Sequence, residues 1–510
     1  MQFIQGKNRT QSILFPDSLD QIVEADNEVR IIDLFVESIN LADFHFVIKT
    51  SKEGRPAYHP KDLLKLFVYG YLNHIRSSRQ LEKESKRNIE LLWLMKQLAP
   101  DHNTIANFRR DNEKAIRKVF RYTVSIAKEF NLIGGKLVAG DSTKLRAQNS
   151  KKNNFNEGKI ERHLAYIDAK LDEYNKVLAE ADEDNKQFIA QEIKKHTERK
   201  TGYENMSRQL QQSGEPQIST SDPASRQLMT RNNISEVAYN IQTVVDAKHN
   251  LFLDYKVTNE NDSRALSGML RRTKTILGTK DFTALYDKGY HTGIEIKKAV
   301  ELDINIMVAI PGTSSNAPNE NYNMDRFIYN EHNDTYTCPQ QQILMTNGNS
   351  YQKNKNENHY LVKHYKTHAC TGCHVRELCT KNVKGRVIER SEYAPYIEIN
   401  KQNIEAKPEI YKKRQSIAEH PYGTIKRQWG FYYIITKKGI KHASADAGLM
   451  FVAYNLRRLI NIIDRNTLTK FLQELVLLFL RKLISLKPFF FKMMHSLLKK
   501  RTTQVFLFEV

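Results

Sequence analysis

The chain has 510 residues, and 79 Lys and Arg against 58 Asp and Glu give it a formal net charge of +21. Its apolar content excludes a wholly disordered chain, its modest Gly and Pro content excludes a collagen-like one, and four cysteines are too few for a disulfide scaffold. The excess of positive charge predicts a polyanionic partner, most simply nucleic acid, although a basic surface without such a partner is the alternative.

No signal for secretion or membrane insertion is expected. The first residues, MQFIQGKNRT, do not place a charged segment before an apolar run, as a secretory signal would. The most apolar stretch, residues 475–480, is followed by Arg481 and Lys482 and is far shorter than the roughly 20 residues that cross a bilayer. We therefore expect a cytoplasmic protein without a membrane partner.

Residues 1–135 are predicted to form an N-terminal helical domain. Leu63, Leu64, Phe67 and Tyr71 recur at helical spacing, and further stretches of the same period follow. Short helices joined by polar turns are typical of helix-turn-helix DNA-binding domains and equally of other small bundles. Six basic residues in this region favour DNA binding, namely Arg76, Arg79, Lys86, Arg87, Arg109 and Arg110.

Residues 136–310 predict the first part of an α/β core. A short apolar strand ends at Asp141, and two alternating strands form a hairpin further along. A helix follows, which Asn261, Asp262 and Ser263 can cap, and then come a strand ending at Asp287, a second helix and a last strand. This order predicts a mixed five-stranded sheet, which the charged, helical residues 150–225 interrupt as a projecting hairpin.

The rest of the chain divides into three predicted segments. Residues 311–402 are polar and rich in turn formers, and they contain all four cysteines. Helical periodicity returns over residues 403–463, and residues 464–510 form a basic, amphipathic tail. We interpret the polar segment as an insertion between the last strand of the core and the helices that complete it.

Three acidic residues stand out by position. Asp141 and Asp287 each end a predicted strand, and Glu419 lies in the helical segment after the insertion. Because strand ends of an α/β sheet meet at one edge, these carboxylates could together hold two Mg²⁺ or Mn²⁺ ions that activate a water or a 3′-hydroxyl. An Asp at a strand end is more often a turn former. Spacing alone does not eliminate the rival acids Asp246, Asp254 and Glu260.

The segment around Glu419 is strongly basic. Over residues 411–460 there are ten Lys and Arg, among them Arg414, Lys426 and Arg427, but only two acids. A solvated surface helix normally carries both signs, so a carboxylate isolated among cations favours a site that attracts phosphates. Two nearby aromatic residues could stack on an unpaired base or belong to the core, namely Trp429 and Tyr432.

The chain resembles the DDE-type insertion-sequence transposases of bacteria, a cut-and-paste group with an RNase H-like catalytic core. The resemblance rests on GDSTKLRAQNS, on DPASRQLMT followed by VAYNIQTVVD, on LYDKGYHTG, and on EHPYGTIKRQWGFYY followed by AYNLRRL. It covers roughly residues 40–463, and residues 55–110 resemble the helical N-terminal domain of these enzymes. It implies DNA transposition, with Asp141, Asp287 and Glu419 as the metal-binding triad.

One group of these enzymes has a Tyr-x2-Arg-x3-Glu-x6-Lys signature in the third motif. Tyr411, Arg414, Glu419 and Lys426 follow it, except that four residues separate the Arg from the Glu. By analogy, the Arg and the Lys contact terminal phosphates. Pro421, just after the Glu, is expected to kink or restart the helix. Further candidate DNA contacts are Tyr290, Arg427 and Trp429.

The cysteines have the spacing of a possible zinc site. They read Cys338-x31-Cys370-x2-Cys373-x5-Cys379, and the x2 pair is typical of a zinc knuckle whose four thiolates would complete a tetrahedral site. A polar insertion with few apolar residues would gain stability from such a metal. Free thiols are the alternative, and other possible ligands are His364, His368 and His374.

The sequence therefore predicts a Mg²⁺-dependent DNA transposase. It would bind the terminal inverted repeats of an insertion sequence and target DNA, act near the nucleoid, and form a homodimer when two ends are brought together. Two other hypotheses are a DNA-binding protein of transposase ancestry that does not cut, and a structure-selective nuclease that cuts without joining.

Overall fold

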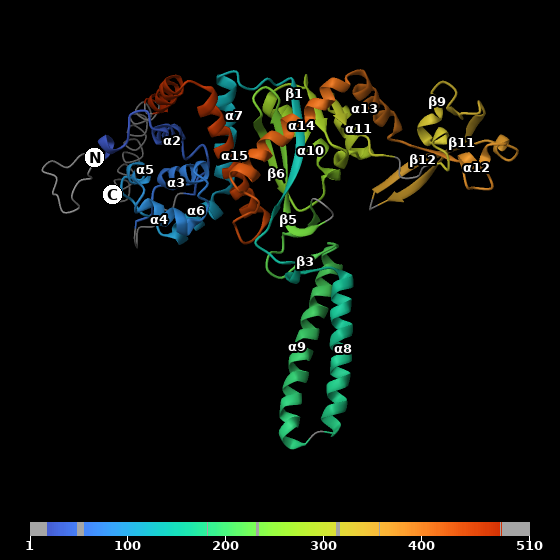
Figure 1. The fold of residues 1–510 in the computed structure, drawn as a ribbon, viewed down its shortest axis with the longest axis horizontal. Coiled ribbons are helices and arrows are strands. Elements are labelled where there is room, and N and C mark those ends of the chain that lie inside the picture. The colour runs from blue at the N-terminus through green and yellow to red at the C-terminus, as the bar shows by residue number, and fades with distance from the viewer. Residues whose placement is uncertain are drawn as a thin grey trace, which may run out of the picture.

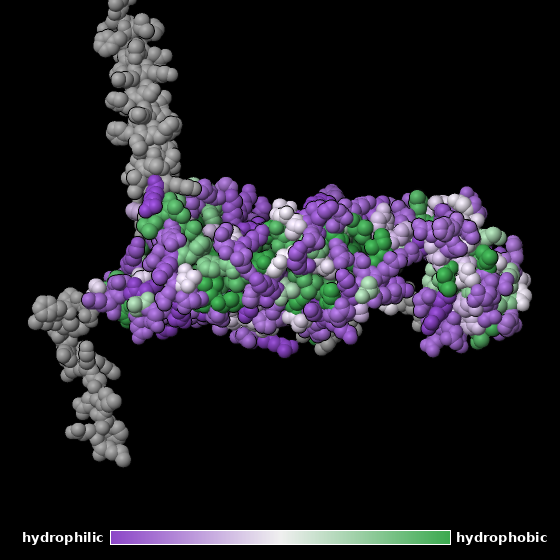
Figure 2. Space-filling view, turned by 90° about the horizontal axis from the view of Figure 1, so that it is seen from above, coloured by the Kyte–Doolittle hydropathy of each residue, from purple (hydrophilic) through white to green (hydrophobic). Residues whose placement is uncertain are grey.

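The computed structural model describes most of the chain. A central sheet lies between the N-terminal helices on one side and a β-rich lobe on the other, and a long helical hairpin projects from the sheet (Figure 1). Seen from above, hydrophilic residues cover most of the surface and the β-rich lobe stands apart at one end (Figure 2). The described residues are 18–47, 56–180, 182–230, 234–312, 317–355, 358–479 and 481.

The N-terminal region is helical, as the sequence predicts. The helix α3 begins with Pro60 in its first turn, where the missing N–H costs nothing, and it is buried along almost its whole length. The helices are α1 (Leu19–Ile22), α2 (Glu28–Glu37), α3 (Pro60–Leu72), α4 (Ser78–Ser85), α5 (Ile89–Leu94), α6 (His102–Asp111) and α7 (Glu113–Glu129).

Two of the six basic residues expected to favour DNA binding are buried instead. Arg76 and Arg109 are each 5% exposed. Arg109 donates to the Tyr71 hydroxyl at 3.0 Å, and Arg76 donates to the Tyr433 carbonyl at 2.8 Å. Both guanidinium groups lie near the buried carboxylate of Asp446, at 3.6 and 3.9 Å, so they are structural cations.

The central sheet has six strands, one more than expected. Its order is β4-β5-β1-β7-β8, with β6 also pairing with β5. β5 is antiparallel to its neighbours, whereas β7 pairs parallel with β1 and β8. The strands are β1 (Leu137–Arg146), β4 (Arg226–Met229), β5 (Ser235–Asp246), β6 (Leu251–Thr258), β7 (Thr283–Tyr286) and β8 (Asn305–Val308).

β1 is longer than the sequence suggests, and Asp141 does not end it. Its parallel pairing with β7 stops at Ala139 opposite Leu285, but its antiparallel pairing with β5 continues to Arg146. The prediction failed because polar residues after Asp141 ended the apolar pattern while backbone pairing with β5 continued. Asp141 therefore stands within β1, just beyond the point where β7 ends.

Helices cover the sheet and complete the hydrophobic core. α15 is buried along most of its length and packs against α7, α3 and β6, so the N-terminal helices and the sheet share one continuous core. Beside it, α14 packs against β1, β5 and β7. The covering helices are α10 (Leu266–Leu277), α11 (Gly293–Glu301), α13 (Ala394–Ala406), α14 (Pro408–Tyr422) and α15 (Ile440–Ile462).

The expected helical hairpin is present and stands away from the body (Figure 1). It consists of α8 (Glu157–Glu180) and α9 (Glu183–Ser213), which pack on each other. The short strands β2 (Asn154–Phe155) and β3 (Ile218–Ser219) close its base. A small cluster separate from the main core, built on Phe155, Ile160 and Leu210, holds this base together.

The insertion folds as a five-stranded antiparallel sheet of order β13-β12-β11-β10-β9, which the turn-rich sequence did not indicate. Its core contains five buried side chains, and Cys338 and Cys379 pack against it. The elements are β9 (Ile328–Asn330), β10 (Thr335–Thr337), β11 (Ile343–Lys355), β12 (Asn358–Lys366), α12 (Arg376–Cys379) and β13 (Ile388–Ser391).

The tail is helical over residues 465–479, and most of the remaining tail lies outside the described residues. Across the described part of the chain, every helix is too short or too polar to cross a membrane.

Candidate active site

Asp141 and Asp287 lie on neighbouring parallel strands. Asp287 directly follows β7, and continuing the pairing of Ala139 with Leu285 by two residues sets the two aspartates side by side. Gly140 permits this arrangement, because a Cβ there would lie 2.0 Å from the ring of Tyr286. The sequence prediction that these two acids converge agrees with this geometry.

The surroundings of Asp141 oppose its negative charge. Burial, with a smaller contribution from the charge of Asp287, raises the pKa of this carboxyl to about 6, although the Ser142 amide and Arg414 act in the other direction. The Arg414 guanidinium lies 3.8 Å from Asp141 Oδ2, and the Ser142 amide donates to Oδ1 at 2.7 Å. A nearby cation would relieve this strain, so the pair is suited to hold one.

Asp287 begins a single 3₁₀ turn, Lys288–Tyr290. Its Oδ1 accepts a hydrogen bond from the Gly289 amide at 2.9 Å, and its side chain is half-buried. This contact fixes the carboxylate at the end of β7, on the same edge of the sheet as Asp141.

Glu419 projects from α14 into the space next to Asp141. Two tyrosines anchor this helix to the sheet: Tyr411 donates to the Tyr286 carbonyl at 3.1 Å, and the hydroxyls of Tyr422 and Thr243 lie 2.5 Å apart. Glu419 is exposed, and it lines a cavity of about 550 Å³ together with Asp141. Other residues that line this cavity are Lys144, Tyr422, Lys426, Arg427 and Tyr432.

α14 does not restart at Pro421. The helix continues through this residue to Tyr422 and then widens into a π-helix, Gly423–Gln428, which carries Lys426 and Arg427. Proline and π-helical turns are both common at irregularities of a helix. Lys426 donates to the Lys144 carbonyl at 3.2 Å, and Arg427 is exposed at the cavity.

Two candidate DNA contacts are buried, which corrects the sequence prediction. Trp429 is 9% exposed, and its ring lies 5.5 Å from that of His74 and 5.7 Å from that of Phe431. Tyr290 is 0% exposed, and its hydroxyl donates to Gln242 Oε1. Neither side chain reaches a surface where DNA could lie.

Two of the three rival acids have structural partners, and the third, Glu260, is exposed. Asp246 accepts hydrogen bonds from the amides of Gly134 and Gly135 at 3.0 and 2.8 Å, as a turn-forming aspartate does. Asp254 is buried between Arg121 and Arg272, each of which lies within 3 Å of its carboxylate.

The sequence analysis missed one acid at this site. Asp262, read there as a helix cap, accepts hydrogen bonds from the side-chain amides of Asn240 and Gln242, each at 2.7 Å, and lies 3.3 Å from Lys144 Nζ. Burial disfavours its charge, but Lys144 and these hydrogen bonds hold its pKa below the ordinary value. The only signal in the sequence was the polar run before the helix, next to a strand of the site. Nothing in that run separates an aspartate that caps a helix from one that belongs to an active site.

The carboxylates fit hard divalent cations by their chemistry, because Asp141 and Asp287 present oxygen ligands that repel each other. Within the described ranges, however, no three His, Cys, Asp or Glu side chains are arranged as a metal site. Glu419 in particular shares the cavity of Asp141 without completing such a group.

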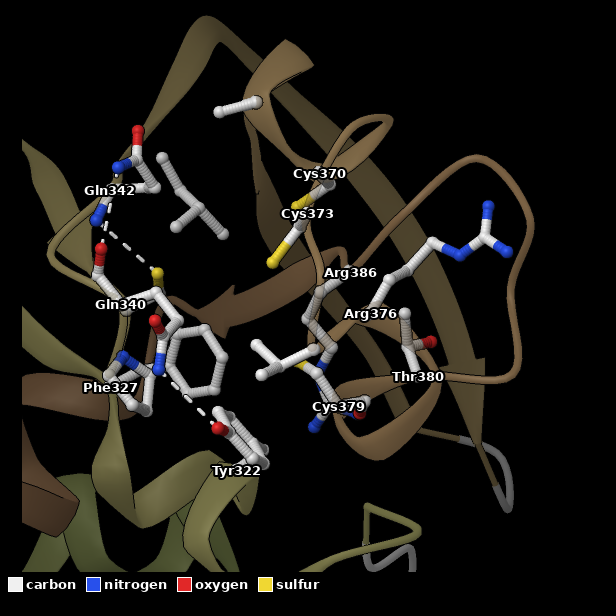
Figure 3. A pocket seen from close by; sticks show the side chains of 15 residues that line it. Tyr322, Phe327, Gln340, Gln342, Cys370, Cys373, Arg376, Cys379, Thr380 and Arg386 are labelled. Carbon is white, nitrogen blue, oxygen red and sulfur yellow. Dashed lines mark hydrogen bonds between the residues drawn. The ribbon is translucent and has the colours of Figure 1, made fainter.

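The four cysteines line one cavity of about 30 Å³ in the insertion, and all four are free thiols (Figure 3). The Gln342 amide lies 3.4 Å from Cys338 Sγ, and the Cys373 amide donates to the Cys370 carbonyl at 3.4 Å. Burial raises the pKa of the Cys379 thiol, and the other three cysteines add to this effect, while Arg386 opposes it. His364, His368 and His374 do not line the cavity.

Two protein families match parts of the chain. The family described as "Transposase domain (DUF772)" matches residues 17–111, and "Transposase DDE domain" matches residues 337–460. No curated protein matches the sequence. The cryo-EM structure of a piggyBac transposase synaptic complex with hairpin DNA aligns with 90% of this chain and 82% of that chain, at 10% sequence identity and a TM-score of 0.27.

Proposed function

We propose that this chain, which its two family matches identify as an insertion-sequence-type DDE transposase, cuts DNA at the ends of its element and joins the ends to target DNA. The observation that carries the proposal is the pair Asp141 and Asp287 at one edge of the sheet, with Glu419 on the same cavity as Asp141. The strand order β6-β5-β1-β7-β8, with β5 antiparallel, supports an RNase H-like core.

Asp141, Asp287 and Glu419 would hold two Mg²⁺ or Mn²⁺ ions. Such ions, when bound, lower the pKa of a water or 3′-hydroxyl and stabilise the leaving oxygen. The protein's own part is to fix the carboxylates: the Gly289 amide orients Asp287, and the two tyrosine contacts of α14 set the position of Glu419.

The basic residues around the cavity would bind the DNA backbone. Lys426 and Arg427 lie on the π-helix at the cavity, and Arg414 contacts Asp141 from α14. Cations there attract phosphates irrespective of base sequence, which suits the cleavage site. The N-terminal helices would read the terminal inverted repeats, and two copies of the chain would pair the two ends in a homodimer.

The test uses the full chain with Mg²⁺ and DNA fragments that contain the element's ends. We expect wild type to cut and to join the freed ends to target DNA. Asp287→Ala should abolish both reactions and leave end binding nearly intact, because the carboxylate lies away from the N-terminal helices. Asp281→Ala is the matched control, since this exposed acid pairs only with Lys136 and its loss should leave cutting unchanged.

The other hypotheses predict different results. A DNA-binding protein without cleavage would bind ends but never cut, and a nuclease would cut without joining. Cutting by Asp287→Ala would remove this residue from the site. Light scattering with and without end DNA tests the proposed homodimer.

We infer further that the four cysteines hold a structural zinc ion. Their shared cavity and a core of only five side chains support this. When bound, zinc would link the four thiolates, which otherwise repel one another.

Metal analysis of the purified full chain tests the zinc proposal. We expect about one zinc per chain in wild type and clearly less in Cys373→Ser and Cys379→Ser. His364→Ala is the control, because this ring stacks on Tyr351 away from the cavity and should not alter the zinc content. Zinc well below one equivalent in wild type would refute the proposal.

A further inference from the structure

Asp262 approaches the active site from the face of the sheet opposite α14. Thr243 meets Tyr422 of α14, and its neighbour Gln242 points the other way because successive residues of a strand face opposite sides. There Gln242 and Asn240 both donate to Asp262 Oδ1. Two amides therefore fix one oxygen of this carboxylate.

The second oxygen of Asp262, Oδ2, lies 3.3 Å from Lys144 Nζ and also faces the turn that follows β7. A Cβ placed on Gly289 would lie 3.5 Å from Asp262 Oδ2 and 3.1 Å from Asp287 Oδ1. The two carboxylates therefore border one small space, which any side chain at position 289 would fill.

We propose that Asp262 is a fourth acidic residue of the cation site, facing Asp287 across Gly289 and binding a divalent cation through the water molecules that the cation retains. Mg²⁺ keeps several waters when a protein binds it, and these waters donate hydrogen bonds to nearby carboxylates. The amide contacts of Asp262 orient it as outer partners of metal sites are oriented. The inference rests on the proposed function, which makes Asp141 and Asp287 the direct ligands.

A purely structural role for Asp262 would not require the space next to Gly289. Pairing with Lys144 and aligning two amides would give Asp262 a place in the fold, but neither contact requires the space at Gly289. The two roles therefore predict different effects on cation binding.

The experiment measures Mn²⁺ binding to the full chain by electron paramagnetic resonance, without DNA. Losing an outer carboxylate typically weakens metal binding about 10-fold to 100-fold, so we expect Asp262→Asn to raise the Mn²⁺ dissociation constant by about 10-fold or more. Gly289→Ala should also weaken binding, because its Cβ would occupy the shared space. Glu260→Gln is the control: it removes an exposed acid two residues away and should bind Mn²⁺ as wild type does.

Circular dichroism and thermal unfolding establish that each variant folds. Wild-type affinity in both Asp262→Asn and Gly289→Ala would overturn this inference and leave the proposed function intact. Absence of Mn²⁺ binding by wild type would overturn the cation site itself and the chemistry proposed for it. If Asp262→Asn does not fold, the same measurement on Asp262→Ser decides, because serine removes the carboxylate and keeps an oxygen that can accept hydrogen bonds from the two amides.

Discussion

At Asp141 the protein keeps a carboxyl group in surroundings that disfavour its ionised form. Burial and the neighbouring Asp287 both raise its pKa, and Arg414 only partly compensates. A fold does not retain such a group for stability, because an ionised carboxyl there costs free energy. Such a raised pKa is typical of carboxyl groups in functional sites, and a bound cation would favour the ionised form.

This raised pKa predicts a pH-dependent stability. The folded pKa of about 6 exceeds the ordinary 3.8, so the folded chain binds this proton more tightly than the unfolded chain does. Between pH 4 and pH 7, wild type should therefore lose about 2 kcal/mol of unfolding free energy relative to Asp141→Asn, which cannot ionise. Urea denaturation in buffer without divalent cations measures the difference. A constant difference across this range would contradict the raised pKa.

Residue chemistry was easier to predict from the sequence than residue burial. Asp287 follows the end of β7 as predicted, but Asp141 lies beside it because the parallel pairing with β7 stops at Ala139, not because β1 ends there. The burial of Trp429 and Tyr290 could not be predicted, because an aromatic residue near basic residues has the same sequence pattern whether it lies in the core or at the surface. Asp262 was missed because its site partners, Asn240 and Gln242, lie on another strand.

At the scale of elements, α14 adds Glu419 and Arg414 to the two aspartates that the strands provide. Its two tyrosine contacts lie on either side of Arg414 and Glu419, and the π-helix that follows presents two more cations to the same cavity. The sequence predicted the helix but not the π-helix that follows it. Pro421 removes one backbone hydrogen bond, and which helical form the next residues adopt depends on packing.

The helical hairpin, in contrast, has its own small core and should be dispensable for the fold. Replacing residues 157–216 by a short Gly-Ser linker removes α8 and α9 but none of the main core. We expect the thermal unfolding midpoint of the body to stay within about 2 °C of wild type, by differential scanning calorimetry. A large decrease would show that the hairpin contributes to the main cooperative unit.

At the scale of the whole molecule, α15 joins the N-terminal helices to the sheet. Asp446 in this helix is 0% exposed, and it accepts hydrogen bonds from the Tyr71 hydroxyl and from the Ile435 amide at 2.7 Å. Arg76 and Arg109 supply the opposite charge. The predicted domain boundary near residue 135 therefore lies within one continuous core, a feature that hydrophobic periodicity cannot show because it is local.

Removing the buried carboxylate should destabilise the entire body. Asp446→Ala leaves two buried guanidinium groups without their anion, which typically costs about 3–5 kcal/mol of unfolding free energy. Guanidinium chloride denaturation followed by tryptophan fluorescence measures this loss. Asp281→Ala, which breaks the exposed pair with Lys136, should leave the transition unchanged. If Asp446→Ala were as stable as Asp281→Ala, the charge of Asp446 would not stabilise the two buried arginines.

The insertion separates the two aspartates from α14 along the chain, and this separation matters while the protein is being made. A nascent chain that has left the ribosome only as far as residue 400 contains Asp141 and Asp287 but lacks Glu419 and both tyrosine contacts of its helix. A product of premature termination would carry the same incomplete site. The proposed DNA cleavage therefore becomes possible only after translation has passed the β-rich lobe and reached α14.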